Sequence, residues 1–129
     1  IQRARSYIYT TGPSPMVAGA LLASLERILN GDSRRSRLQE NIARLRQGIA
    51  ALSCSYDLLP SRTGIQALVV GDNARALELG IRLFDQGYWV PAIRPPTVPV
   101  GTARLRISLS ASHTSEQIDG LLAALANAL

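Results

Sequence analysis

Two arginines that stand two residues apart in the segment "ARLRISLS" offer the clearest chemistry in this sequence. Side chains alternate between the two faces of a β-strand, so Arg104, Arg106 and Ser108 are expected on one face of a sheet. A guanidinium held on a rigid strand can donate two parallel hydrogen bonds to a carboxylate. The same spacing is also typical of an antiparallel strand whose polar face meets water. The strand alone leaves both interpretations open.

The segment before this strand, "AIRPPTVPVGT", favours a carboxylate site. Its prolines fix the backbone and remove N–H donors. They therefore lower the entropic cost of holding Arg94 and Thr97 in fixed positions. A rigid loop that presents an arginine is typical of a binding edge. Protection of a sheet edge by proline is the alternative explanation.

Local patterns predict the elements that must hold these residues. They indicate an α+β fold, in which helices cover one face of a small, mostly antiparallel sheet of three or four strands. The apolar spacing and turn residues predict an extended segment at 7–9, helices at 15–29 and from a cap at Ser33 to 52, a strand at 65–70, a helix from a cap at Asp72 or Asn73 to Gly87, strands at 88–93 and 103–110, and a last helix capped by Thr114 and Gln117.

The helix expected at 15–29, "PMVAGALLASLERIL", is apolar on most of its faces. A helix that is hydrophobic nearly all round is normally buried by other parts of a protein. The remaining elements of this chain are few. We therefore expect a missing domain or a partner subunit to cover this helix.

The composition is that of one globular domain, with 129 residues, 47% of them hydrophobic and 18% charged. No apolar run is long enough to span a membrane, so we expect no membrane partner. The start of the chain lacks the residue order of a signal peptide, and the single cysteine cannot form an internal disulfide. These features predict a cytoplasmic location.

All 14 basic residues are arginine, and the formal net charge is +5. Such a charge makes an arginine-rich nucleic-acid-binding domain an alternative function. The arginines are scattered, however, except in "DSRRSR" at a predicted helix start. A solvated helix face is therefore the favoured interpretation, and we expect no nucleic-acid partner.

Four other residues carry weaker signals. His113 is the only histidine and has no second ligand at a usable spacing, so we expect a helix-cap role and no metal. Cys54 lies in a turn-rich connector and is predicted to be inert. Tyr88 and Trp89 are expected to pack against a helix, with a substrate-facing aromatic as the alternative.

Three blocks of the sequence together resemble the C-terminal part of the α-oxoamine synthases, which are pyridoxal-phosphate enzymes of fold type I. The blocks are "YIYTTGPSPMVAGALLASL", "IQALVVGDNARALEL" and "YWVPAIRPPTVPVGTARLRISLSASHT", in that order. Within the family, "AIRPPTVP" resembles the biotin-pathway branch, and a glycine C-acetyltransferase-like member is the alternative. The resemblance implies a single C-terminal small domain at 1–129, with 1–30 as a leading segment and linking helix to a missing large domain.

The resemblance also implies an activity and a set of site residues. The implied reaction condenses L-alanine with pimeloyl-CoA or pimeloyl-acyl-carrier protein in a homodimer that uses pyridoxal 5'-phosphate. Arg106 matches the arginine that binds the substrate α-carboxylate, and Arg94 and Thr97 match the loop at the acyl entrance. Thr11, and less well Thr10, match the hydroxyl that reaches the cofactor phosphate of the neighbouring subunit.

The chain departs from the family pattern in two ways. The catalytic lysine is absent because the sequence has no lysine, so this chain alone is expected to be inactive. Residues 12–15 replace the serine and double proline that the family often has there. A non-catalytic dimerisation module is a further alternative.

Overall fold

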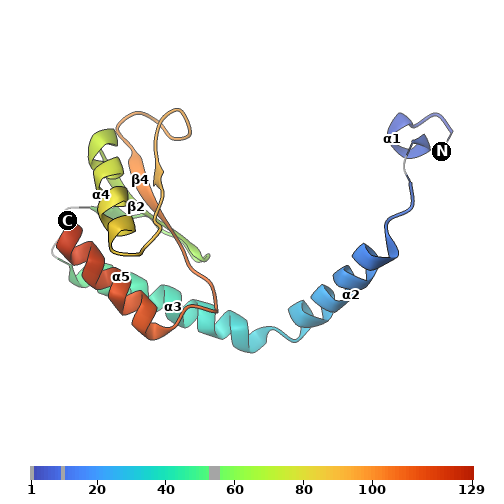
Figure 1. The fold of residues 1–129 in the computed structure, drawn as a ribbon, viewed down its shortest axis with the longest axis horizontal. Helices are drawn as coiled ribbons and strands as arrows, with labels where there is room; N and C mark the ends of the chain where they lie inside the picture. The colour runs from blue at the N-terminus through green and yellow to red at the C-terminus, as the bar shows by residue number, and fades with distance from the viewer. Residues whose placement is uncertain (1, 10, 53–55) are drawn as a thin grey trace. The chain divides into compact units, whose positions relative to one another are not determined.

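The computed structural model describes residues 2–9, 11–52 and 56–129. The chain divides into two compact units, Ile1–Asp32 and Ser33–Leu129, which are described separately (Figure 1). None of the described helices is long and apolar enough to cross a membrane.

The first unit contains two helices, α1 (Arg5–Ile8) and α2 (Pro15–Leu29). The expectation of an extended segment at 7–9 is wrong, because the N–H of Ile8 donates to the Ala4 carbonyl at 2.9 Å in a single helical turn. Three alternating residues are too few to specify a strand without a partner strand. The bounds predicted for α2 are confirmed, and proline suits its first turn.

The second unit contains an antiparallel sheet with the strand order β1-β2-β4-β3 among the described residues. The α+β fold class is therefore confirmed. The strand preceding the proline-rich loop is shorter than predicted, because Pro91 has no N–H to donate to a neighbouring strand. The first strand was not expected, since two residues carry no readable alternation. The strands are β1 (Asp57–Leu58), β2 (Ile65–Gly71), β3 (Ala92–Ile93) and β4 (Ala103–Ser108).

Three helices of this unit, α3, α4 and α5, pack against one face of the sheet (Figure 1). Leu68, Leu105 and Ile107 point from the sheet into this core and are 0–1% exposed. The alternate residues of β4 must then point to the opposite, uncovered face. The helices are α3 (Asp32–Ala51), α4 (Asn73–Asp85) and α5 (Ser115–Ala128).

The helix caps test the local predictions. The Asp72 carboxylate accepts from the N–H of Arg75 at 2.8 Å, which confirms the predicted start of α4. Gly87 follows this helix with a φ of 89°, a conformation that favours glycine. The capping box of Thr114 and Gln117 is also confirmed. The cap predicted at Ser33 is wrong, because α3 already begins at Asp32, where an acidic side chain favours the helix dipole.

Candidate functional site

Arg106 lies on the uncovered face of β4, and its backbone is held from both sides. Its N–H donates to the Pro91 carbonyl at 3.0 Å, and on the other side it pairs with Ala67 of β2. Its side chain is exposed and forms no hydrogen bond or ion pair with any residue that the structure describes. The structure therefore presents a free guanidinium on a fixed strand, which can bind a carboxylate through two parallel hydrogen bonds.

Arg104 was expected to share this face, and its side chain is used differently. Its Nε donates to the Thr102 carbonyl at 3.0 Å, and its terminal nitrogen donates to the Thr102 hydroxyl at 3.1 Å. The residue is half-buried. The two arginines of the strand are therefore not equivalent, since one binds the preceding loop and the other is free.

The loop between β3 and β4 carries Arg94 and Thr97, which are both exposed. A first turn is closed by the Thr97 N–H, which donates to the Arg94 carbonyl at 3.0 Å. A second turn is closed by the Thr102 N–H, which donates to the Pro99 carbonyl at 3.2 Å. Gly101 occupies the third position of that turn with a φ of 78°, as a type II turn requires. The loop is thus a pair of defined turns.

These predicted site residues lie in two different units. Arg94, Thr97 and Arg106 belong to the second unit, on β4 and on the loop that leads into it. Thr11 belongs to the first unit, is exposed, and precedes α2 by a few residues. Thr10 lies outside the described residues, as does Cys54.

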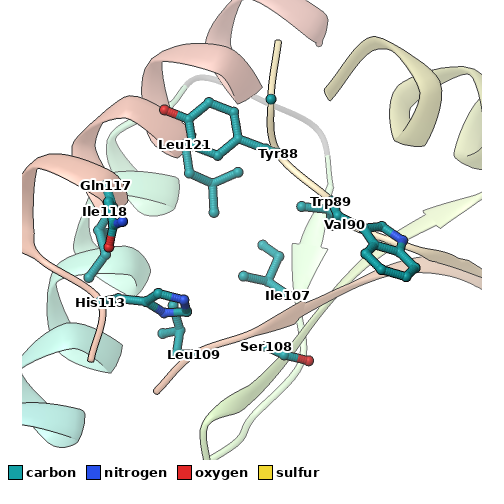
Figure 2. A pocket seen from close by; sticks show the side chains of 11 residues that line it. Tyr88, Trp89, Val90, Ile107, Ser108, Leu109, His113, Gln117, Ile118 and Leu121 are labelled. Atoms are coloured by element: carbon teal, nitrogen blue, oxygen red, sulfur yellow. The ribbon is translucent and has the colours of Figure 1, made fainter. Parts of the chain in front are cut away.

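A pocket of about 270 Å³ opens elsewhere in the second unit, between the N-terminal half of α5 and the end of β4 (Figure 2). The His113 ring lies beside Leu109 at one end, and its Nδ1 accepts from the N–H of Ser110 at 3.2 Å. This bond gives the histidine a structural role in the loop before α5, but Thr114 caps that helix, so the helix-cap role expected for the histidine is wrong. Tyr88 packs over Gly120 of α5, as predicted. Trp89 is 83% exposed at the pocket rim, so the prediction that it packs against a helix is wrong.

The model of the family described as aminotransferase class I and II matches residues 1–125. The chain belongs to this family. It is 57% identical over 127 residues to an 8-amino-7-oxononanoate synthase from Herminiimonas arsenicoxydans, covering 97% of this chain and 32% of that protein. The chain thus spans about a third of the length of the curated relatives that it matches.

Solved structures agree with this membership. A serine palmitoyltransferase from S. paucimobilis with bound PLP and myriocin is 31% identical, with a TM-score of 0.82. The match covers 97% of this chain and 31% of the palmitoyltransferase chain. An 8-amino-7-oxononanoate synthase from Francisella tularensis is also 31% identical, with a TM-score of 0.79. The match covers 98% of this chain and 36% of the synthase chain.

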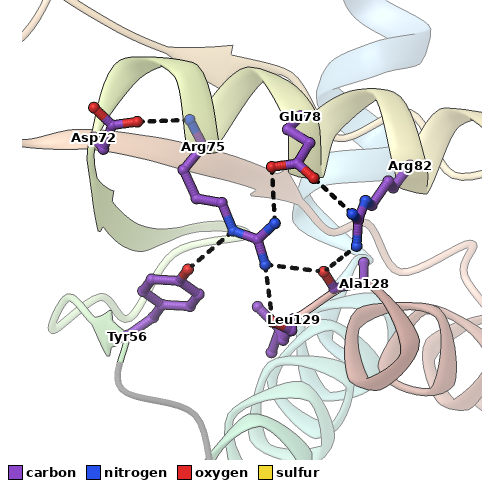
Figure 3. Close-up of polar contacts among 7 residues, drawn as sticks. All are labelled: Tyr56, Asp72, Arg75, Glu78, Arg82, Ala128 and Leu129. Atoms are coloured by element: carbon purple, nitrogen blue, oxygen red, sulfur yellow. Dashed lines mark hydrogen bonds and ion pairs between the residues drawn. The ribbon is translucent and has the colours of Figure 1, made fainter.

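In this chain of the aminotransferase family, two further arginines bind the end of α5 (Figure 3). Arg75 donates to the carbonyls of Ala128 and Leu129 at 3.3 and 2.8 Å, and Arg82 donates to that of Ala128 at 3.3 Å. Glu78 forms ion pairs with both arginines. The two cations therefore stabilise the carbonyl end of α5, which is the negative end of its dipole.

The charged groups of this cluster shift each other's pKa values. Hydrogen bonding to Tyr56, and then to Glu78, raises the pKa of Arg75 above its ordinary value. The hydrogen bond from Arg75 lowers the pKa of the Glu78 carboxyl. Both shifts favour the charged forms, and the hydrogen bonds and ion pairs of these groups link α4 to the end of α5.

Sequence reasoning missed the contact between Arg104 and Thr102. Strand alternation placed both strand arginines on one face, and that placement agrees with the structure. The sequence signal that distinguishes Arg104 from Arg106 is the threonine two residues before Arg104. At that spacing one guanidinium reaches both the carbonyl and the hydroxyl of Thr102.

Proposed function

We propose that this chain is the C-terminal small domain of an 8-amino-7-oxononanoate synthase. The longer enzyme condenses L-alanine with a pimeloyl thioester, and carbon dioxide and the thiol carrier leave. The identity of 57% to a relative of that name is the observation that supports this activity most. Curated relatives of the same name from other bacteria are 51–56% identical over nearly the whole chain, which supports the biotin-pathway branch.

In this proposal Arg106 binds the α-carboxylate of L-alanine. The support is its exposed side chain, which is free of partners among the described residues, on a strand held by the Pro91 carbonyl and by β2. A guanidinium on a fixed strand orients the amino acid and lowers the entropic cost of reaching a reactive geometry. Arg94 and Thr97 line the entrance for the pimeloyl chain on the adjoining loop.

Pyridoxal phosphate supplies the electron sink for this chemistry when it is bound. Thr11, and less well Thr10, are proposed to contact the cofactor phosphate of the neighbouring subunit in a homodimer. The exposed hydroxyl of Thr11 stands shortly before the N-terminus of α2, where the helix dipole favours an anion. The chain has no lysine, so the lysine that binds the cofactor covalently belongs to another part of the longer enzyme. The isolated chain is therefore inactive in this proposal.

The first unit supplies the linking helix in this proposal. All fifteen residues of α2 are described and none is buried, although the helix carries many large apolar side chains. We assign its cover to the large domain of the longer enzyme. The cytoplasmic location expected from the sequence stays a prediction.

A nucleic-acid-binding function is disfavoured because many arginine side chains are hydrogen-bonded to groups of this chain. Phosphate binding needs free arginines on one face. Several arginines instead bind groups within the second unit, namely Arg44, Arg46, Arg75, Arg82 and Arg104.

The test is steady-state kinetics on the full-length gene product. Arg106→Ala is expected to raise the KM for L-alanine about thirtyfold or more, as loss of a partner from a desolvated charge pair does, with little change in the KM for the thioester. Arg94→Ala is expected to raise the KM for the thioester, with little change in the KM for L-alanine. The matched control is Arg34→Ala, on the exposed surface of α3.

Two outcomes would overturn this proposal. Intact mass and absorbance show the length of the natural gene product and its bound cofactor. A product of only 129 residues with no bound pyridoxal phosphate would contradict the proposed activity. If Arg94→Ala affects alanine and Arg106→Ala affects the thioester, the assignment of the two arginines is reversed.

A further inference from the structure

The loop that carries Arg94 and Thr97 is tied to one residue at both of its ends. At its start, Ile93 of β3 pairs with Arg104 of β4 through the backbone ladder. At its end, the Arg104 side chain holds Thr102 by two hydrogen bonds of 3.0 and 3.1 Å. A single residue of a central strand therefore fixes the closing distance of the loop.

The contact at Thr102 continues into the loop. The Thr102 hydroxyl accepts from the Arg104 guanidinium and donates to the Pro99 carbonyl at 2.7 Å. The N–H of Thr102 donates to the same carbonyl at 3.2 Å. A chain of this kind polarises each successive hydrogen bond and so strengthens the group as a whole. The guanidinium thus fixes the second turn of the loop.

The surroundings of Arg104 leave its side chain little alternative. Its backbone pairs with Val69 of β2 on one side and with Ile93 of β3 on the other, and the residue is half-buried. A partly buried guanidinium without hydrogen-bond partners is unfavourable. Its planar fork matches the carbonyl and the hydroxyl of Thr102, which lie two residues back along the chain.

We infer that Arg104 is a positioning residue for the acyl substrate, which acts through Thr102 and the loop that carries Arg94 and Thr97. The inference rests on the proposed function, because that function assigns the loop to the pimeloyl entrance. Arg104 does not touch the substrate in this role. It sets the place of the two residues that do, while Arg106 on the same strand binds the amino acid.

The test compares matched variants of the full-length enzyme. Arg104→Met keeps the length of the side chain and removes its donors, and Thr102→Val keeps the shape and removes the hydroxyl. Each is expected to raise the KM for the thioester about tenfold, the size of one lost charge-assisted hydrogen bond, with less than about a twofold change in the KM for L-alanine. Thr102→Ser keeps the hydroxyl and should restore the thioester KM.

The double variant Arg104→Met/Thr102→Val distinguishes one linked contact from two separate effects. Its thioester KM should rise by less than the product of the two single effects, because both variants remove the hydrogen bond between the Arg104 guanidinium and the Thr102 hydroxyl. Multiplied effects would overturn the inference, and so would equal changes in both KM values or a lower Tm with unchanged kinetics. Arg44→Met, which removes an arginine contact between α3 and α5, is the control for general destabilisation.

Failure of the inference is distinguishable from failure of the proposed function. If Arg94→Ala raises the thioester KM and Arg104→Met does not, the loop binds the acyl chain but Arg104 does not position it. If neither variant changes the thioester KM, the assignment of the loop itself fails.

Discussion

Helices α2 and α5 are similar in length and in apolar content but differ fully in burial. α5 has 14 residues and buries one face in the core of the second unit, through Leu121, Leu125 and their neighbours. α2 has 15 residues, all described, and none is buried; Leu21, Leu22 and Leu25 are each more than half exposed. Apolar content thus predicts that a helix needs a cover, but it does not identify what covers it.

The same two helices differ at their N-termini. Thr114 and Gln117 form a reciprocal capping box at the start of α5, with bonds of 3.0 and 3.3 Å. Ser14, at the same position before α2, forms no side-chain cap bond. The start and the apolar face of α5 are therefore both satisfied within the second unit, whereas those of α2 are not satisfied by the residues described.

The largest expected difference between the helices is in the cost of removing a leucine. Leu125→Ala in α5 should lower the free energy of unfolding of the 129-residue chain by about 2–5 kcal/mol, because Leu125 is 0% exposed and a cavity would remain. Leu25→Ala in α2 should change it by less than about 0.5 kcal/mol, since leucine and alanine are both good helix formers. Urea unfolding followed by circular dichroism measures both.

The longer enzyme sharpens this comparison. If the large domain covers α2, Leu25→Ala should there cost about 2 kcal/mol or more, as in any packed core. An equally small effect in the long and short proteins would contradict the proposed cover of the linking helix. Comparable losses for both leucines in the short chain would contradict the difference in burial itself.

An intermediate effect is expected from the caps. Thr114→Ala should lower the free energy of unfolding by about 1 kcal/mol, because it leaves the N–H of Gln117 without its acceptor. Ser14→Ala should have almost no effect, since that side chain makes no cap bond to lose. Thermal unfolding of the two variants measures the difference. Thr114→Ser, which keeps the hydroxyl, is the control, and a loss equal to that of Thr114→Ala would refute the capping explanation.

The elements that could be predicted from the sequence are those fixed by neighbouring residues. The bounds of α2, the cap at Asp72, Gly87 and the capping box of Thr114 each depend on contacts within a turn or two. Strands β1 and β3 depend instead on partner strands distant in the sequence, and each has only two residues. No local pattern of that length can specify a strand.

The candidate site was predictable to a similar extent. Strand alternation placed Arg104 and Arg106 on the uncovered face correctly, because one face of β4 had to enter the core. It could not tell which guanidinium was free. That distinction depends on the turn closed between Pro99 and Thr102, which brings two oxygen atoms to Arg104 and none to Arg106 among the described residues.

The smallest expected effect concerns the charged face of α5. Asp119 of α5 accepts two hydrogen bonds from Arg44 of α3, one of them 2.7 Å long, and both side chains are about half exposed. This contact lowers the pKa of the Asp119 carboxyl below its ordinary value. A carboxyl with a lowered pKa in the folded state stabilises the fold above its ordinary pKa, and this contribution is lost as the pH falls through the lowered pKa.

Asp119→Asn should therefore be slightly less stable than the original chain near neutral pH, and the difference should shrink as the solution is acidified. The pKa of Glu116 is lowered first by a hydrogen bond from Thr114 and is raised slightly by the charge of Asp119, so the matched variant Glu116→Gln in both backgrounds isolates the contribution of Asp119. Added salt should reduce the difference at neutral pH, because the pair is solvent-exposed. A difference that stayed constant from neutral to acid pH would show that Asp119 acts through packing and not through its charge.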